Sequence, residues 1–362
     1  MRSGGIFRDC GFRRQSDPCE IADATRIAEI RIAWVSRTST KNNKIAWDDS
    51  LAAVSNTDQG GCIISNVVIS SPHASTRATI SRRAFFKTAF GGAASAAFYA
   101  GEIDRHWLET THHEVRLPGR AQDFDGFRVA QLTDIHMEEF TEPYFLREAV
   151  QCINQLKPDV VVLTGDFVTR ELGSRKFAEG TAWQCASILA ELECQTRYAI
   201  FGNHDHLVGR EPVGAALTEN GVTVLRNHHV PLERGRGRLW LAGVDDPVMG
   251  RPNPEQAIPE AIRNQQNEPV ILLCHAPDFV NQIRTQPEGR AVGLMLSGHT
   301  HGGQVRIPFV PPVHLPPLGR QYLAGWFQLD NLQLYVNRGL GTVGLPFRLN
   351  CAPEVSCFTL RA

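Results

Sequence analysis

Five short apolar segments of this chain each stop at Asp, Asn or His, and this repeated pattern limits the fold more than any other feature. Each segment is bounded by Gly, Pro or polar residues, which is typical of buried strands. They span residues 129–133, 160–164, 198–201, 270–274 and 293–297. The motifs that end them are Asp134-Ile135-His136, Gly165-Asp166, Gly202-Asn203-His204-Asp205, His275 and Gly298-His299-Thr300-His301.

Helical segments lie between several of these strands, which favours an open α/β arrangement. The clearest helix spans residues 141–156, with Thr141 as its cap, Pro143 in its first turn and Pro158 beyond its end. In such sheets binding sites form where the carboxyl ends of strands meet loops, so the five motifs should meet at one edge. Residues 222–244 and 332–360 hold further short strands and predict a second sheet. We therefore predict an α/β fold, a two-sheet β-sandwich flanked by helices.

Composition and charge agree with a globular domain and narrow the classes of partner. Of 362 residues, 42% are hydrophobic and 21% are charged, which is unlike a disordered or membrane-spanning chain. The formal net charge of -1 gives no broad basic surface, so no nucleic-acid partner is expected and any phosphate binding must be local. The nine cysteines form no zinc pattern. Either Cys185 pairs with Cys194 and Cys351 with Cys357 after export, or the thiols are buried and free.

The chain ahead of the first strand divides into two parts of different character. Residues 1–78 are rich in Ser, Thr, Asn and Arg without helical or strand periodicity, so we expect them to be disordered. Residues 79–101 resemble a twin-arginine signal or anchor, because Arg82-Arg83 precedes Phe85-Phe86-Lys87 and then a weakly apolar stretch. That stretch has about 13 residues, fewer than the roughly 20 of a spanning helix. The alternative is a chance Arg pair ahead of an Ala-rich helix.

A twin-arginine signal predicts which machinery and which compartment the protein meets. We expect export by the twin-arginine machinery to the periplasm or the outer face of the cytoplasmic membrane, with a cytoplasmic membrane-associated protein as the alternative. Such signals normally start a chain, and no Met lies between Met1 and Met137. We therefore hypothesise that translation begins at a non-AUG codon near Val67 or Val68, so that the upstream stretch is not part of the natural protein. Residues 102–111 would be a linker.

The order of the five motifs resembles the calcineurin-like metallophosphoesterase superfamily. The similarity covers residues 112–362, which we therefore predict to be the catalytic domain. Two further stretches, GHTHGGQVRIPF from Gly298 and YVNRGLGTVGLPFRLNCAPEV from Tyr335, resemble a bacterial exported or membrane-associated subfamily. That subfamily includes twin-arginine-exported phosphodiesterases and relatives that cleave UDP-2,3-diacylglucosamine in lipid A biosynthesis.

The resemblance implies a binuclear metal centre with seven ligands and a shared carboxylate. One divalent transition metal ion would be bound by Asp134, His136, Asp166 and His301, and the other by Asp166, Asn203, His275 and His299. Asp166 would bridge the two. This ligand set contains no thiolate and accepts Mn, Fe or Zn. A hydroxide that bridges the metals would attack phosphorus in line with the leaving group.

Four residues near the ligands receive separate predictions. His204 is expected to protonate the departing oxygen, and Asp205 is expected to orient His204. Arg338 is a candidate for binding the substrate phosphate, with a structural turn arginine as the alternative. His206 has no role in the family pattern, so we expect an exposed loop residue.

The predicted reaction is hydrolysis of a phosphodiester or pyrophosphate bond in a small-molecule or lipid-linked substrate. Phe167 follows Gly165-Asp166 where Ser/Thr protein phosphatases have a different sequence, which argues against protein substrates. The apolar segment from Ile307 to Trp326 either admits acyl chains and touches a membrane surface or packs on the sandwich. UDP-2,3-diacylglucosamine fits the subfamily but is cytoplasmic, in conflict with an export signal. The alternatives are an exported phosphomonoesterase or nuclease, and a non-catalytic metal-stabilised binding scaffold.

Overall fold

The computed structural model describes residues 81–362 apart from 118–120, 138, 170–174, 265–267 and 313–314. By its contacts the chain divides into two units, Met1–Thr76 and Arg77–Ala362, and the described residues all belong to the second. The predictions of disorder over residues 1–78 and of a start near Val67 or Val68 lie outside the described residues.

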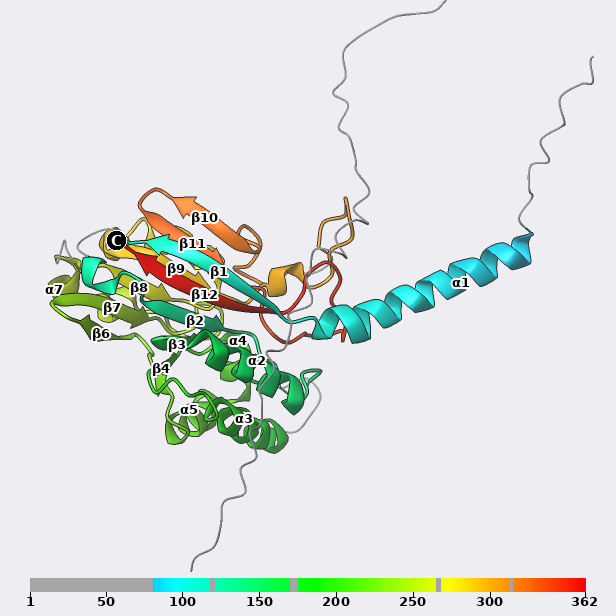
Figure 1. Ribbon diagram of the computed structural model, residues 1–362, viewed down its shortest axis with the longest axis horizontal. Helices are drawn as coiled ribbons and strands as arrows, with labels where there is room; N and C mark the ends of the chain where they lie inside the picture. Colours follow the sequence, from blue (N-terminus) through cyan, green and yellow to red (C-terminus); the bar gives the residue numbers. More distant parts are fainter. Residues whose placement is uncertain (1–80, 118–120, 138, 170–174, 265–267, 313–314) are drawn as a thin grey trace, which may run out of the picture. The chain divides into compact units, whose positions relative to one another are not determined.

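The first sheet has six strands and carries three of the five predicted motifs (Figure 1). In spatial order its strands are β1 (Glu109–Arg116), β12 (Glu354–Arg361), β2 (Arg128–Leu132), β3 (Val160–Leu163), β4 (Arg197–Ala199) and β5 (Thr223–Val224). Neighbouring strands run parallel except for the pair β12 and β2. The carboxyl ends of β2, β3 and β4 therefore lie at one edge.

The second sheet also has six strands and carries the other two motifs. In spatial order its strands are β10 (Gly325–Leu329), β11 (Leu332–Val336), β9 (Val292–Ser297), β8 (Val270–Leu273), β7 (Gly237–Gly243) and β6 (His228–Arg234). Its four central strands are parallel, and the edge strands β6 and β10 are antiparallel to their neighbours. Together the two mixed sheets confirm the predicted α/β two-sheet fold.

Alternation of side chains along the strands builds three apolar layers. On β3, Val160 and Val162 pack toward the second sheet in one cluster with Ile271. Val161 and Leu163 point the other way and pack under the helices that cover the first sheet. This period of two is what a strand buried on both faces requires. The core thus holds both sheets rigidly behind the strand ends.

Helices cover the outer face of each sheet. The first sheet is covered by α2 (Pro143–Leu156), α3 (Arg175–Leu189), α4 (Asn203–Val208) and α5 (Arg210–Glu219). Over the second lie α6 (Pro254–Ala257), α7 (Glu260–Arg263) and α8 (Val280–Ile283). Single 3-10 turns are η4 (Ala121–Phe124), η5 (Pro277–Phe279), η6 (Pro287–Arg290) and η7 (His301–Gly303). The predicted cap of α2 is wrong, since Glu142 occupies the N-cap position and no side chain caps the helix.

Among the helices in the described part of the chain, α1 (Arg82–Phe98) is distinguished by having no buried side chain. Ser81 caps it by accepting a hydrogen bond from the backbone N–H of Ala84, at 3.2 Å. Among the described residues, no helix combines the length and the hydropathy that crossing a bilayer requires.

The segment after α1 is attached to the domain, so the predicted linker over residues 102–111 is wrong. It forms the π-helix η2 (Tyr99–Ile103) and the 3-10 turn η3 (Asp104–His106). Arg105 is buried and forms an ion pair with Glu142 at 3.0 Å, while its guanidinium also donates to the carbonyl of Phe140. The Ala100 carbonyl accepts a hydrogen bond from the backbone N–H of Arg348. The folded domain therefore begins near Ala100.

Candidate metal centre

The five motifs meet at one edge of the sandwich, as the strand pattern predicts. Three groups of side chains bring nitrogen and oxygen atoms within 4.8 Å of one another. They are Asp134, His136 and His301; His136, Asp166 and His204; and Asp166, His275 and His299. The first and third groups correspond to the two predicted halves of the centre, and Asp166 belongs to the group between them.

Asp166 lies between the two halves in the manner of a bridging ligand. Its Oδ2 atom is 3.5 Å from Nε2 of His136 and 3.1 Å from Nε2 of His275. Its Oδ1 atom accepts a hydrogen bond from the backbone N–H of His204 at 2.8 Å. Burial alone would raise the pKa of Asp166, but His275 and His204 outweigh it and hold that pKa well below its ordinary value. The carboxylate is therefore ionised and available to two cations.

Outward hydrogen bonds orient the histidine rings. The outer nitrogen donates to a backbone carbonyl in three of them: His275 Nδ1 to Thr164 at 2.7 Å, His301 Nδ1 to Gly341 at 3.2 Å, and His299 Nε2 to Pro317 at 2.8 Å. Because a carbonyl can only accept, the outer nitrogen of each ring carries a proton, and the inner nitrogen is the one that faces the centre. Metal-ligating histidines are held in this way.

His136 is the fourth histidine of the centre, and the pKa values of two of the others give their protonation state. His136 places Nδ1 2.5 Å from the Thr169 hydroxyl, and its Nε2 lies 3.1 Å from Nε2 of His301. Burial lowers the pKa of His299 and of His301 to about 3. Both rings are therefore neutral near pH 7, which is the form that binds a metal ion.

Unpartnered buried atoms test whether these residues fit a metal pair. Asn203 Oδ1, which belongs to the predicted second half, is buried without a hydrogen-bond partner. A buried polar atom without a partner costs roughly 1–3 kcal/mol. A cation bound to this oxygen would remove that cost, so the residues fit the metal centre that the family pattern implies.

Backbone strain is concentrated in the same residues. Left-handed φ values occur at five of the seven predicted ligands, which are Asp134, His136, Asp166, His299 and His301. Such a conformation costs a non-glycine residue roughly 1 kcal/mol or more. Close packing adds to the constraint, because a Cβ atom at Gly202 would lie 2.2 Å from Oδ1 of Asp166. The strained backbone at these residues therefore lowers stability, and it turns the predicted ligands toward one point.

Asp205 holds the motifs together and does not orient His204 as predicted. Its carboxylate accepts hydrogen bonds from the backbone N–H groups of Gly202 and Asp166 at 2.8 Å each and of Phe167 at 2.9 Å. His204 Nδ1 is buried without a hydrogen-bond partner. Asp205 therefore fixes the loop after β3 against the start of α4.

A cavity of about 380 Å³ opens beside the centre, and its wall contains two chemically different kinds of residue. Asp166 and His204 are among the polar ones. The apolar ones include Val305, Val343 and Leu345. A ligand in this cavity could thus contact both polar residues of the centre and apolar side chains.

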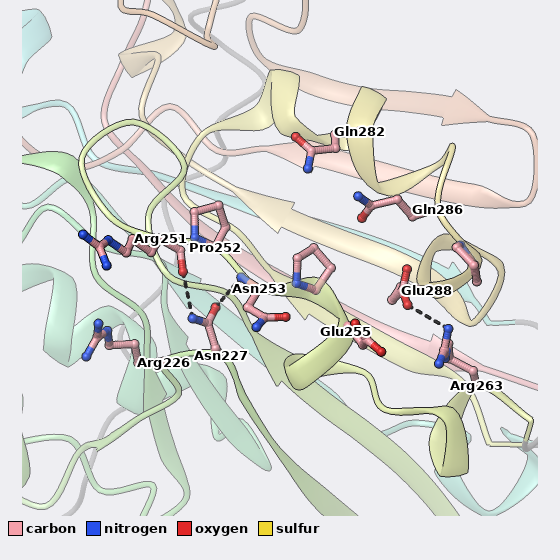
Figure 2. A pocket seen from close by; sticks show the side chains of 12 residues that line it. Arg226, Asn227, Arg251, Pro252, Asn253, Glu255, Arg263, Gln282, Gln286 and Glu288 are labelled. Atoms are coloured by element: carbon pink, nitrogen blue, oxygen red, sulfur yellow. Dashed lines mark hydrogen bonds and ion pairs between the residues drawn. The ribbon is translucent and has the colours of Figure 1, made fainter.

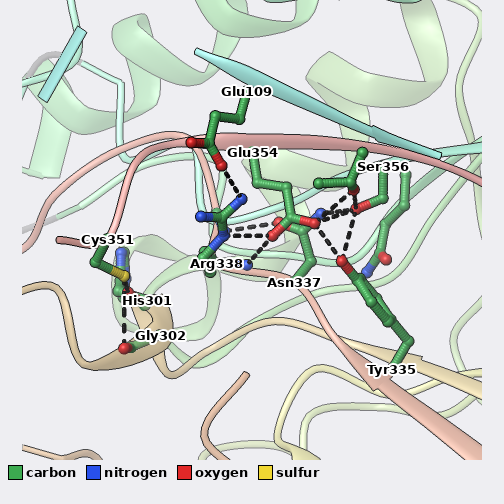
Figure 3. A network of polar contacts seen from close by, with 12 residues as sticks. Glu109, His301, Gly302, Tyr335, Asn337, Arg338, Cys351, Glu354 and Ser356 are labelled. Carbon is green, nitrogen blue, oxygen red and sulfur yellow. Dashed lines mark hydrogen bonds and ion pairs between the residues drawn. The ribbon is translucent and has the colours of Figure 1, made fainter. Parts of the chain in front are cut away.

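Arg338 turns away from the ligands and joins a paired polar network (Figure 3). Its guanidinium contacts Glu354 and Glu109, at 2.8 Å each. Glu354 also accepts hydrogen bonds from Thr111 and Ser356, at 2.7 Å each, and from the Tyr335 hydroxyl. The role of Arg338 in binding substrate stays a prediction, because Arg338 is not among the residues that line the cavity.

The strand pattern extends to a sixth motif that our sequence analysis missed. β7 ends at Gly243, and two buried carboxylates, Asp245 and Asp246, follow it. Asp246 interacts electrostatically with His275 and Asp166, and its Oδ1 atom is buried without a partner. An apolar run that stops at acidic residues was the available signal. Our sequence analysis also missed Thr169. Its sequence signal was weaker, because it was only a hydroxyl residue three positions after Asp166.

His206 is not an exposed loop residue, and that prediction is wrong. Its Nε2 atom lies 2.8 Å from Asp245, and the side chain is 6% exposed. Asp245 also pairs with Arg226 at 3.0 Å, and this arginine lines a second cavity of about 730 Å³ (Figure 2). None of the predicted site residues lines that cavity. The Asp245 carboxylate therefore links Arg226, on the wall of the second cavity, to His206 on α4.

The free-thiol alternative is confirmed for the cysteines that the structure describes. Cys152, Cys185, Cys194, Cys274, Cys351 and Cys357 are all free.

Comparison with known proteins identifies the class that this fold and site define. A family model for calcineurin-like phosphoesterases matches residues 127–303. "Uncharacterized metallophosphoesterase YkuE" of Bacillus subtilis (strain 168) is 34% identical over 293 residues, which cover 78% of this chain and 98% of the relative. "Phosphodiesterase YaeI" of Escherichia coli (strain K12) is 33% identical over 288 residues, which cover 78% and 99%. The chain belongs to the calcineurin-like phosphoesterase family and is a metallophosphoesterase.

Proposed function

We propose that this metallophosphoesterase hydrolyses a phosphodiester or pyrophosphate bond in a substrate that also carries an apolar group. The observation that carries the proposal is the mixed lining of the cavity, where Asp166 and His204 occur together with the apolar Val305, Val343 and Leu345. A lipid-linked phosphoester matches both kinds of lining, because its charged and apolar parts each leave water for suitable surroundings. The name of the Escherichia coli relative supports the phosphodiester as the bond.

The seven predicted ligands would hold two divalent metal ions, of which Mn, Fe and Zn suit their oxygen and nitrogen atoms. Bound there, the metals would neutralise phosphate oxygens and lower the pKa of a water molecule between them. The protein's own part is to hold the ligand lone pairs inward through Thr164, Gly341 and Pro317. Orientation fixed before the substrate arrives costs nothing during the reaction.

His204 is the residue best placed to protonate the leaving oxygen. It starts α4 beside Asn203, and it lines the cavity. Its ring centroid lies 4.9 Å from that of His136, with an interplanar angle of 89°. The hydrogen bond from its backbone N–H to Asp166 fixes the ring next to the bridging carboxylate. Proton donation from this position would lower the barrier for poor leaving groups most.

The location is part of this proposal and rests on the sequence at the start of α1. Arg82 and Arg83 begin the helix, which supports export by the twin-arginine machinery and work at the outer face of the cytoplasmic membrane. The subfamily resemblance points to UDP-2,3-diacylglucosamine, which would require the cytoplasmic membrane-associated alternative. A lipid-linked phosphodiester outside the cell membrane removes that conflict.

Two alternatives make different predictions. An exported phosphomonoesterase or nuclease would use the same ligands with a different leaving group, but the apolar side chains of the cavity wall would then have no apolar part of the substrate to contact. A non-catalytic scaffold is expected to have lost ligands, whereas this chain keeps all seven and brings six of them into the ligand groups described above. Asn203 lines the cavity beside them.

The test is turnover by the full chain, reconstituted with Mn, Fe or Zn in turn. The substrates are bis-(p-nitrophenyl) phosphate, p-nitrophenyl phosphate and UDP-2,3-diacylglucosamine, with Asp166→Asn as background. We expect the diester to be hydrolysed at least tenfold faster than the monoester. A faster monoester would establish the phosphomonoesterase instead. No turnover above the Asp166→Asn background with any metal would overturn the enzymatic proposal.

A further inference from the structure

We propose that two loops at the mouth of the metal-site cavity dock onto an anionic lipid bilayer. These rim loops are residues 304–310 and 343–349. The inference rests on the proposed function, because a docked cavity would receive the apolar part of its substrate from the membrane. Val305, Val343 and Leu345 belong both to the rim loops and to the cavity wall.

The rim loops are bonded to each other and form one surface. The backbone N–H of Leu349 donates to the carbonyl of Gln304 at 3.0 Å, and that of Arg306 donates to the carbonyl of Leu349 at 2.8 Å. The Gln304 side chain donates to the carbonyls of Val343 and Leu345, at 3.2 and 3.0 Å. A surface that binds one rim loop therefore positions the other.

Large apolar side chains on the rim loops face solvent. Phe309 is 105% exposed and Leu345 is 58% exposed, with Ile307 and Val310 close to half exposed. Contiguous exposed apolar side chains beside a binding cavity mark an interaction surface. Burial against lipid would remove them from water.

Phe309 also has a backbone conformation that folding alone does not favour. Its φ angle is 67°, in the left-handed region, which an aromatic residue adopts at a cost. The exposed ring makes up for none of that cost within the domain. A strained residue that presents an apolar ring to solvent is evidence of function at that position.

The rim loops are continuous with α1, the other exposed apolar element. Ala100 and Gly101, just after α1, contact Arg348 and Phe347, and a Cβ atom at Gly101 would lie 3.1 Å from the Phe347 ring. In Figure 1 the foot of α1, in cyan, meets the domain at this place. Four exposed phenylalanines lie along the helix, Phe85, Phe86, Phe90 and Phe98. The exposed phenylalanines of α1 thus lie on a helix whose C-terminal end contacts the second rim loop.

Charge selects an anionic bilayer as the occupant. Residues 302–326 contain Arg306, which is half-buried, and Arg320, which is exposed, and no Asp or Glu. In the second rim loop Arg348 is fully buried and adds no surface charge, and Glu139 accepts a hydrogen bond from the backbone N–H of Gly344 at 2.9 Å. The α1 segment contains Arg82, Arg83 and Lys87 without an acidic residue. Clustered basic residues beside apolar side chains favour anionic headgroups. A protein partner would have to match the same basic and apolar surface, and the experiment below separates the two.

The direct test is co-sedimentation of the full chain with vesicles of phosphatidylglycerol and phosphatidylethanolamine, compared with phosphatidylcholine alone. The loop variant is Ile307→Ser with Phe309→Asn, because Asn tolerates the left-handed conformation better than Ser does. The matched control is Trp183→Ser, which removes an exposed aromatic side chain from α3. We expect the loop variant to lower the partition coefficient on anionic vesicles about tenfold, and the control to leave it unchanged.

A second variant separates the loops from the helix. Phe86→Ser with Phe90→Ser should weaken partition by its own factor, and the four substitutions together should multiply the two factors, because both surfaces contact one bilayer. Partition of the loop variant equal to that of the Trp183→Ser control would overturn the proposal, since α1 alone would then bind. Equal binding to phosphatidylcholine would refute the anionic headgroup as the ligand.

Activity on soluble bis-(p-nitrophenyl) phosphate keeps the docking proposal separate from the proposed function. We expect the loop variant to hydrolyse this diester as fast as the wild type, which also proves that it folds. If the wild type hydrolysed the diester but did not bind vesicles, docking alone would be refuted. If the wild type bound vesicles but did not hydrolyse the diester, the proposed function alone would be refuted. If the loop variant turned a dimer into a monomer and left partition unchanged, the rim loops would be a self-association surface and the proposal would fail.

Discussion

The metal centre and the network around Glu354 both bury charged groups near strand ends, but they differ in how those groups are satisfied. Glu354 is 1% exposed, and Arg338, Thr111 and Ser356 all contact its carboxylate. The centre instead leaves Asn203 Oδ1 and His204 Nδ1 buried without hydrogen-bond partners. Both regions bury polar groups, and the unpaired atoms distinguish the one that needs a ligand.

Backbone conformation separates the two regions in the same direction. Five predicted ligands of the centre have left-handed φ values, while Tyr335, Glu354 and Ser356 are not among the described residues that do. The centre holds strain that a bound metal would offset, and the network stabilises the strands that carry the centre. Removing a side chain should therefore cost activity in the first region and stability in the second.

The largest expected effect is that of Asp166→Asn. Loss of the bridging carboxylate should lower kcat/KM by at least about a thousandfold, because the two halves lose their shared ligand. Steady-state hydrolysis of bis-(p-nitrophenyl) phosphate and metal content per chain measure it. The control is Asp159→Asn, near the other end of β3, where the carboxylate accepts a hydrogen bond from the Arg128 backbone. Equal losses in the two variants would contradict the bridging role.

His204→Ala should cost about a hundredfold in kcat, but only with a poor leaving group. A diester of an aliphatic alcohol needs a proton at the departing oxygen, whereas p-nitrophenolate leaves without one. The measurement is the ratio of kcat for the two diesters in the variant and in the wild type, with the exposed His112→Ala as control. A loss of the same size with both diesters would assign His204 to phosphate binding instead of proton donation.

The opposite outcome is expected for Glu354→Gln in the paired network. Loss of the charge beside Arg338 should lower the free energy of unfolding by about 2 kcal/mol, while kcat at saturating metal stays within about twofold. Urea unfolding and diester hydrolysis on the same preparations measure both. Loss of activity at unchanged stability would break the comparison between the two regions, because the network would then act in catalysis.

The pH dependence of the difference in stability between wild type and Glu354→Gln gives a second test of the same prediction. Burial alone would raise the pKa of Glu354, but Arg338 and the hydroxyl donors hold it below its ordinary value of 4.5. A lowered folded-state pKa stabilises above the unfolded value and ceases to do so as the pH falls through the folded one. The stability gap between wild type and Glu354→Gln should therefore be full at pH 7 and shrink as the pH drops below 4.5. A gap that grows on acidification would show that Glu354 is protonated in the fold.

The residues that meet at the centre could be predicted from the sequence because each follows a buried strand, and that is a local pattern. The atoms that orient these residues could not, because they are backbone carbonyls of distant segments: Thr164 is 111 residues from His275, and Gly341 is 40 residues from His301. A backbone carbonyl has no residue type to recognise. The pairing of His206 with Asp245 was hidden for another reason, because the two side chains are 39 residues apart and neither motif indicates its partner.

The smallest predicted effect concerns Thr169, a residue that orients a ligand without touching the metal. Its hydroxyl lies 2.5 Å from His136 Nδ1, and Thr169→Val would leave that nitrogen without its partner. The ring could then protonate either nitrogen, which should weaken the metal affinity of the half formed by Asp134, His136 and His301 about tenfold. Calorimetric metal titration measures it, and Thr181→Val, which removes a local hydrogen bond in α3, is the control. If Thr169→Val bound metal as tightly as the wild type, packing alone would orient the His136 ring. The Thr169 hydroxyl would then be a satisfied polar group of the fold, without a role in the metal centre.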